Sequence, residues 1–171
     1  MKILIAMFAL AISAPATAGE VFGGLFVHGV DTALSLGSSP EGGVDVQLGY
    51  RGGAIIESTG LQPYVFGSVN SKGDTHFAAA GLSWKFGDKV YVRPGLGLAI
   101  HTGSARNTSD PFNDRIEFGS RVLFEPELGI GARFSERVSV EASWVHLSHA
   151  TLFGRQNPGI DSIGARLNWK L

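Results

Sequence analysis

Strict alternation of apolar and polar residues along several stretches constrains the fold of this chain more than any other feature. From Val138 the even positions carry Val, Val, Ala, Trp, His and Ser, whereas the first odd positions carry Ser, Glu and Ser. From residue 161 the apolar residues take the odd positions, and Arg166, Asn168 and Lys170 take even ones. Successive side chains of a β-strand point to opposite faces, so each stretch predicts a strand with one apolar face.

The spacing of such stretches predicts a closed sheet. We expect about eight strands, at residues 20–30, 44–51, 61–70, 78–86, 90–101, 121–134, 138–149 and 161–171. The connections after the fourth and sixth are short, and those after the first, fifth and seventh are longer and polar, notably 102–117. Short turns at one end and long loops at the other are typical of outer-membrane barrels, which must close because lipid offers no hydrogen-bond partners. The sequence therefore predicts an all-β protein, an eight-stranded antiparallel transmembrane β-barrel.

The charged residues within the strands indicate which face points inward. Seven of them lie opposite the apolar faces: Arg51, Arg93, Arg121, Glu125, Glu127, Glu141 and Arg166. A soluble lipid-binding barrel would expose these charges, whereas a membrane barrel encloses them. Bulky aromatic residues would crowd an eight-stranded interior, and four near the short turns resemble an interfacial girdle: Trp84, Phe86, Phe134 and Trp169. We expect the apolar faces to contact lipid and the charges to pair inside.

The first 18 residues have the features of a secretory signal peptide. Lys2 precedes an apolar core at 3–12, which is too short to span a bilayer, and Ala16-Thr17-Ala18 is a small-residue cleavage motif. The alternative is a short buried helix. We expect cleavage before Gly19, with 19–171 forming the barrel domain.

The formal net charge of -1 implies no bulk attraction to nucleic acid, and without cysteine the barrel cannot rely on disulfides.

Three polar side chains interrupt the apolar faces where the last two strands meet their loop. If these strands pair as a hairpin, His146, Ser148 and Asp161 share one face near one end of the barrel. A nucleophile, a base and an acid that orients the base are the parts of an acyl-transfer triad, and an apolar setting suggests a lipid substrate. Taken singly, each residue is more often structural. His149 is a competing base, although its parity directs it inward. The remaining histidines are expected to be structural: His28, His76 and His101.

The same region resembles a known family. The run His146-Leu147-Ser148, followed by 157–161 with the sequence NPGID, is similar to the active-site region of the PagL-type lipid A 3-O-deacylases of the bacterial outer membrane. The resemblance implies Ser148 as nucleophile, His146 as general base and Asp161 as its orienting group, with Asn157 contacting the oxyanion. It also implies no metal or cofactor. The implied substrate is lipid A of lipopolysaccharide in the outer leaflet, which loses the ester-linked acyl chain at its 3-position.

This chain departs from the family pattern at several places. It has Asp161 where the family has Glu, His149 where the family has Asn, and a loop before Asn157 about one residue longer.

We expect the acyl chain to lie along the outward stripe formed by Ala142, Trp144, Ile163 and Ala165. The charges of 102–117 either contact lipopolysaccharide phosphates or are simply solvated. A non-enzymatic barrel, structural or adhesive, stays open as the alternative function.

Overall fold

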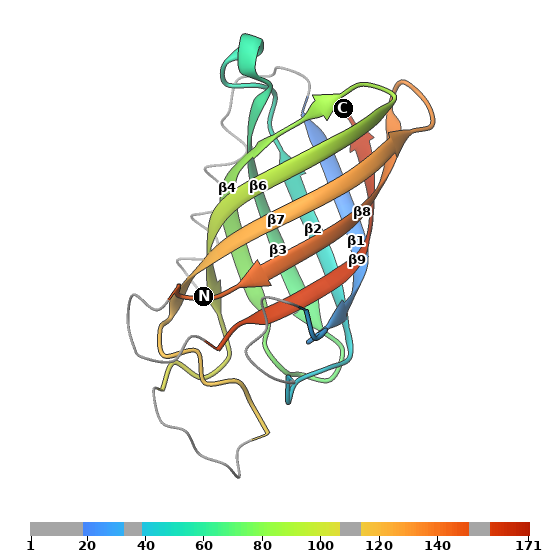
Figure 1. Ribbon diagram of the computed structural model, residues 1–171. Helices are drawn as coiled ribbons and strands as arrows, with labels where there is room; N and C mark the ends of the chain where they lie inside the picture. The colour runs from blue at the N-terminus through green and yellow to red at the C-terminus, as the bar shows by residue number, and fades with distance from the viewer. Residues whose placement is uncertain (1–18, 33–38, 107–113, 151–157) are drawn as a thin grey trace.

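The computed structural model describes residues 19–32, 39–106, 114–150 and 158–171 and shows a closed antiparallel β-barrel (Figure 1). Its strands are β1 (Glu20–His28), β2 (Val44–Arg51), β3 (Leu61–Asn70), β4 (Phe77–Trp84), β5 (Phe86–Gly87), β6 (Val90–His101), β7 (Val122–Arg133), β8 (Val138–Leu147) and β9 (Ile160–Lys170). The hydrogen-bonded order is β4-β3-β2-β1-β9-β8-β7-β6-β5, and pairing of β4 with β6 closes the sheet. β5 continues the register of β4 against β6, so the barrel wall has eight spans. The predicted fold is confirmed.

The two faces of the strands differ sharply in exposure. On β9, Ile163 and Leu167 are 44% and 53% exposed, whereas Arg166 and Asn168 are each 1% exposed. The polar face therefore points into the barrel and the apolar face covers its outside. A soluble barrel has the opposite arrangement, so the expectation of an outward face suited to lipid is confirmed. Within the described residues, no helix is long and apolar enough to cross a membrane.

Ion pairs fill much of the lumen. Arg166 Nη1 lies 2.6 Å from Glu127 Oε2, and Arg93 Nη1 lies 2.7 Å from Glu20 Oε1. Arg51 contacts both of these carboxylates through its two terminal nitrogens. Because a buried charge is costly unless it is paired, these contacts allow the lumen to hold both signs of charge. The predicted interior position is confirmed for six residues: Arg51, Arg93, Glu125, Glu127, Glu141 and Arg166.

The predicted interior position of the seventh charged residue, Arg121, was wrong. Arg121 is exposed and lies just before β7, outside the span. Its Nη1 donates hydrogen bonds to the backbone oxygens of His101 and Gly103, at 3.1 and 2.8 Å. Arg121 therefore fastens the connection between β6 and β7 instead of joining the lumen network.

Aromatic rings occupy the lumen as well, which corrects the expectation that they would crowd it. The guanidinium of Arg166 lies over three inward rings, at 5.0 Å from Phe22, 5.2 Å from Phe26 and 5.1 Å from Phe66. Gly49 makes the room, because a Cβ there would lie 2.4 Å from the Phe22 ring and 2.5 Å from Phe66 Cβ. Such cation–π contacts stabilise a buried guanidinium. The interior is therefore packed with both charges and rings.

The two ends of the barrel differ as predicted. At one end, residues 88–89 and 134–137 make short turns, and the C-terminus lies at this end (Figure 1). The outward aromatics Phe86, Phe134 and Trp169 gather here and are 58%, 74% and 49% exposed. The connection from β2 to β3 is longer and contains the short helix η1 (Glu57–Thr59). The other end carries the long loops, including 102–121 and the connection from β8 to β9.

Candidate active site

The predicted contact between His146 and Asp161 is present in the structure. The two residues are directly opposite each other in the antiparallel pairing of β8 with β9. His146 Nδ1 and Asp161 Oδ1 are 2.8 Å apart, a hydrogen bond in which the imidazole donates when Nδ1 carries its proton. Cross-strand partners project from the same face of a sheet, so strand pairing alone brings this base and carboxylate together.

The pair lies on the outward face at the long-loop end. Along β8 it follows the exposed residues Val140 and Ala142, and along β9 it precedes the exposed Ile163. His146 and Asp161 are nevertheless only 6% and 1% exposed. The residues that follow β1 cover them: the Val30 N–H donates to the Asp161 backbone oxygen at 2.9 Å. The carboxylate thus projects from the outward face of β9 but is enclosed by protein.

Two further side chains donate to the Asp161 carboxylate. The indole Nε1–H of Trp144 donates to Oδ1 at 2.8 Å, and the hydroxyl of Thr32 donates to Oδ2 at 2.7 Å. The Trp144 ring also stacks on the His146 imidazole, with centroids 5.9 Å apart and planes inclined at 24°. Sequence reasoning assigned Trp144 only to the acyl stripe, although its parity with His146 was a usable signal. It missed Thr32, which lies 129 positions from Asp161 and carries no local signal.

Ser148 follows His146 by two positions and has the same parity. Its backbone continues the pairing with β7, since its N–H donates to Phe124 O at 3.2 Å and its O accepts from Phe124 N at 2.7 Å. The residue as a whole is 6% exposed. Among the described residues, the structure shows no hydrogen bond between this hydroxyl and the His146 ring. The structure therefore brings His146 and Asp161 together, and Ser148 has the same strand parity without a hydrogen bond to the imidazole.

Gly159 indicates how the His146 imidazole is oriented. A Cβ at Gly159 would lie 2.7 Å from His146 Cε1 and 3.2 Å from His146 Nε2. The register of β8 with β9, extended by one pair, sets Ser148 opposite Gly159. The Cε1–Nε2 edge of His146 is therefore turned toward Gly159, while its Nδ1 meets Asp161.

The comparisons with known proteins identify the family of the chain. The model of the family "Lipid A 3-O-deacylase (PagL)" matches residues 35–170, which is most of the chain. The chain belongs to the lipid A 3-O-deacylase family. Family and fold together support an ester hydrolase of the bacterial outer membrane, with lipid A as the family's substrate class. The predicted resemblance is confirmed.

Solved structures support the fold. The crystal structure of the outer-membrane enzyme PagL is 21% identical with a TM-score of 0.63, covering 89% of this chain and 99% of that one. Neisserial surface protein A is 16% identical with a TM-score of 0.56, covering 90% and 97%. A designed transmembrane β-barrel is 12% identical with a TM-score of 0.54, covering 90% and 95%. A search of curated proteins found no match.

Asn157 and the other histidines are the remaining candidate residues of this deacylase family member. Asn157, the predicted oxyanion contact, lies outside the described residues. His149 is 1% exposed and has the parity opposite to Ser148. His101 Nε2 bonds the backbone oxygen of Ser120 at 2.7 Å, and His76 Nδ1 accepts from the Asn70 N–H at 3.0 Å. Over the described part of the chain, no group of three or more His, Asp or Glu side chains could hold a metal ion.

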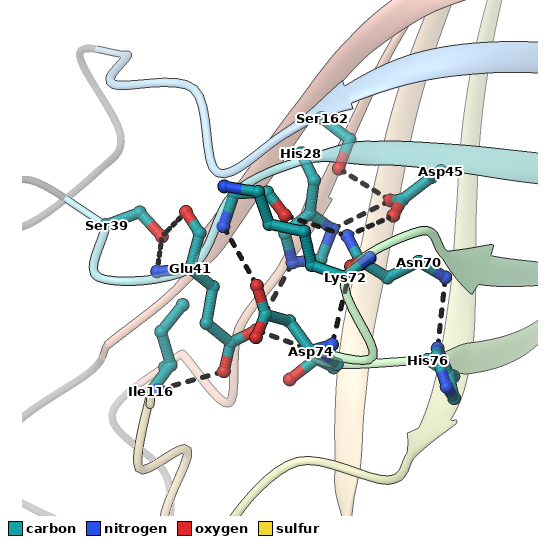
Figure 2. Close-up of polar contacts among 12 residues, drawn as sticks. His28, Ser39, Glu41, Asp45, Asn70, Lys72, Asp74, His76, Ile116 and Ser162 are labelled. Carbon is teal, nitrogen blue, oxygen red and sulfur yellow. Dashed lines mark hydrogen bonds and ion pairs between the residues drawn. The ribbon is translucent and has the colours of Figure 1, made fainter. Parts of the chain in front are cut away.

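His28 belongs to a polar cluster beneath the long loops (Figure 2). Its Nδ1 lies 2.8 Å from Asp45 Oδ2 and its Nε2 lies 3.2 Å from Glu41 Oε2. Glu41 also accepts from the backbone N–H groups of Thr75 and Ile116, at 3.1 and 3.0 Å. Burial raises the pKa of Glu41, but these hydrogen bonds, His28 first, outweigh it and hold the pKa below the usual value. The cluster thereby joins three loops at the end where the site lies.

Proposed function

We propose that this chain hydrolyses the ester bond to the acyl chain at the 3-position of lipid A, with a triad of Ser148, His146 and Asp161. The observation that carries the proposal is the 2.8 Å hydrogen bond between His146 and Asp161, on the outward face of a barrel of the deacylase family. In this arrangement Ser148 is the nucleophile, His146 the general base and Asp161 the group that orients it.

The first half of the reaction forms an acyl-enzyme. With its proton on Nδ1, His146 presents a lone pair at Nε2 and accepts the Ser148 hydroxyl proton as Oγ attacks the ester carbonyl. Asp161 stabilises the resulting imidazolium. The tetrahedral intermediate then collapses, the bond from carbonyl carbon to sugar oxygen breaks, and His146 returns its proton to that oxygen. The apo separation of Ser148 and His146 closes on substrate binding, as catalytic hydrogen bonds often do.

The second half releases the fatty acid. Water attacks the acyl-enzyme carbonyl, His146 accepts a proton from it, and Ser148 leaves with that proton restored. The Asn157 side chain is proposed to donate to the oxyanion in both halves. Loss of one such donor typically lowers the rate by about 10²–10³-fold.

The substrate is proposed to reach the site from the outer leaflet. Long loops of outer-membrane barrels face the cell exterior, and the pair lies at that end, at the depth where lipid ester bonds meet the headgroups. The outward stripe of Ala142, Trp144, Ile163 and Ala165 continues from the site toward the middle of the barrel wall. An acyl chain lying on this stripe would bury apolar surface on both partners.

Mass spectrometry of lipid A tests the proposal. Cells that produce the wild-type protein should show lipid A that has lost one hydroxyacyl mass, and Ser148→Ala or His146→Ala should abolish this loss. Ser58→Ala, an exposed serine at the opposite end of the barrel, is the matched control and should act like wild type. Unmodified lipid A with correctly folded wild-type protein would favour the non-enzymatic barrel, and an active Ser148→Ala protein would reject the nucleophile.

The export signal is part of the same proposal. Cleavage after Ala18 gives a mature chain that begins at Gly19, directly before β1. The N-terminal mass of protein purified from the outer membrane checks this: a chain that retains residues 1–18 would contradict the cleavage.

A further inference from the structure

We propose that Trp144 and Thr32 are positioning residues, which fix the Asp161 carboxylate for its bond to His146. The inference rests on the proposed function, because it assigns roles within the same site. Both residues donate to the Asp161 carboxylate, and Trp144 also stacks on the His146 ring.

Together, the three donors hold both carboxylate oxygens. Oδ1 accepts from His146 Nδ1 and from Trp144 Nε1, each at 2.8 Å, and Oδ2 accepts from the Thr32 hydroxyl at 2.7 Å. Rotation of the carboxylate about the Cβ–Cγ bond would move both oxygens and break these hydrogen bonds. Asp161 is 1% exposed, so water has little access to replace a lost donor.

Trp144 fixes the position of the imidazole as well as the carboxylate. Its indole plane stacks on the His146 ring while its N–H reaches past that ring to Asp161. A tryptophan side chain has only two torsions, so an indole whose N–H is hydrogen-bonded has little freedom to move. The ring orientation and the carboxylate orientation are thus set by one side chain.

Thr32 fixes the carboxylate through its other oxygen, Oδ2. It belongs to the residues that follow β1, and the neighbouring Val30 N–H bonds the Asp161 backbone oxygen at 2.9 Å. The residues that precede β2 are held in turn by Glu41, which accepts from His28 and from the backbone of two other loops (Figure 2). Thr32 therefore approaches Asp161 from a loop that is tied at both of its described ends.

The chemical consequence lies in the tautomer of His146. A carboxylate fixed at Nδ1 keeps the proton there and leaves the Nε2 lone pair free for the serine hydroxyl. Without the two donors, Asp161 can turn away, and His146 populates orientations and tautomers that cannot accept the proton. The loss of these hydrogen bonds therefore falls on the chemical step.

Kinetics with isosteric variants provide the test. In purified full-length protein, Trp144→Phe and Thr32→Val should each lower kcat about tenfold, the usual order for a hydrogen bond to a charged group. The KM of Thr32→Val, which is not part of the acyl stripe, should stay unchanged within about twofold. Thr32→Ser keeps the hydroxyl and should restore most of the wild-type kcat. Trp169→Phe, in the girdle, and Thr102→Val, on another loop, are matched controls and should retain wild-type kcat. Wild-type kcat in both Trp144→Phe and Thr32→Val would overturn the inference.

A spectroscopic measurement separates this inference from the proposed function. The imidazole Nδ1–H proton of His146 should give a low-field NMR resonance that disappears in Asp161→Asn and persists in Ser148→Ala. We expect Trp144→Phe and Thr32→Val to shift or broaden it; an unchanged resonance in both would overturn the positioning role. If Ser148→Ala stays active, the proposed function fails while this resonance still decides the positioning. If Trp144→Phe does not fold, the comparison of Thr32→Val with Thr32→Ser decides alone.

Discussion

Gly159→Ala should inactivate the enzyme without unfolding the barrel. The added Cβ would lie 2.7 Å from His146 Cε1, 3.1 Å from the Leu147 backbone oxygen and 3.2 Å from His146 Nε2. The φ angle of Gly159 is not among the positive values of the chain, so its backbone accepts alanine without strain. The three atoms nearest to the added Cβ therefore belong to the imidazole and the adjacent strand.

The size of the effect follows from these distances. Carbon atoms in good contact are about 3.5–4.0 Å apart, so the His146 ring has to move by about 1 Å. The ring cannot move freely, because Nδ1 is bonded to Asp161 at 2.8 Å and one face is stacked on Trp144. A misplacement of about 1 Å in a catalytic group costs about 10²-fold in rate, or about 2.7 kcal/mol of transition-state stabilisation. We expect kcat to fall by this factor.

The assay compares initial rates of hydroxy fatty acid release from lipid A with the unfolding of the same protein samples. Gly67→Ala on β3 is the matched control, since a Cβ there would have no atom within 4 Å. It should keep the wild-type rate, and both variants should keep the wild-type unfolding midpoint within the error of the measurement. Wild-type kcat in folded Gly159→Ala would refute the position assigned to the His146 ring.

Three other predictions concern the lumen, the loops and the oxyanion. Glu127→Gln leaves Arg166 without its 2.6 Å partner and should lower the free energy of unfolding by about 3–5 kcal/mol, whereas Glu136→Gln on an exposed turn should change it little; equal urea midpoints would contradict this. Because the folded-state pKa of Glu41 is lowered, its contribution to stability is complete at neutral pH and is lost as the pH falls below about 4. Urea midpoints measured from pH 7 to 3 should therefore fall less steeply for Glu41→Gln than for the wild type. Asn157→Ala should lower kcat by about 10²–10³-fold in the same fatty acid assay, and an unchanged kcat would exclude its oxyanion role.

The fold was predictable because its determinant is local. Successive side chains of a strand alternate between the lipid outside the barrel and the charged lumen inside it. Apolar and polar residues therefore alternate, and the pattern is clear along β8 and β9. It is weak along β1, where the inward positions carry Phe22 and Phe26 beneath the Arg166 guanidinium in place of charged groups. Sequence reasoning treated apolar residues as outward, and cation–π packing inside the lumen breaks that rule.

The site was predictable only to the extent that strand pairing determines it. His146 and Asp161 meet because parity puts them on the same face and the hairpin register sets them opposite each other. Thr32 reaches Asp161 through loop geometry, which no short-range pattern encodes. Arg121 failed for a related reason: the alternation extends past the first residue of β7, so the pattern misplaced the point at which the strand begins.

The charges inside the barrel also determine the alignment of the site on its outside. Glu141 lies opposite Arg166 and points inward, and five positions away on each strand His146 lies opposite Asp161 and points outward. A slip of β9 by one residue would turn Arg166 toward lipid, at a cost of about 2–4 kcal/mol near the bilayer midplane, besides breaking its lumen pairs. A slip of two residues would preserve the faces but move Asp161 about 7 Å along the strand, beyond the reach of His146. The same slip would separate Arg166 from Glu141. The lumen ion pairs therefore penalise both slips and favour the register that forms the His146–Asp161 hydrogen bond.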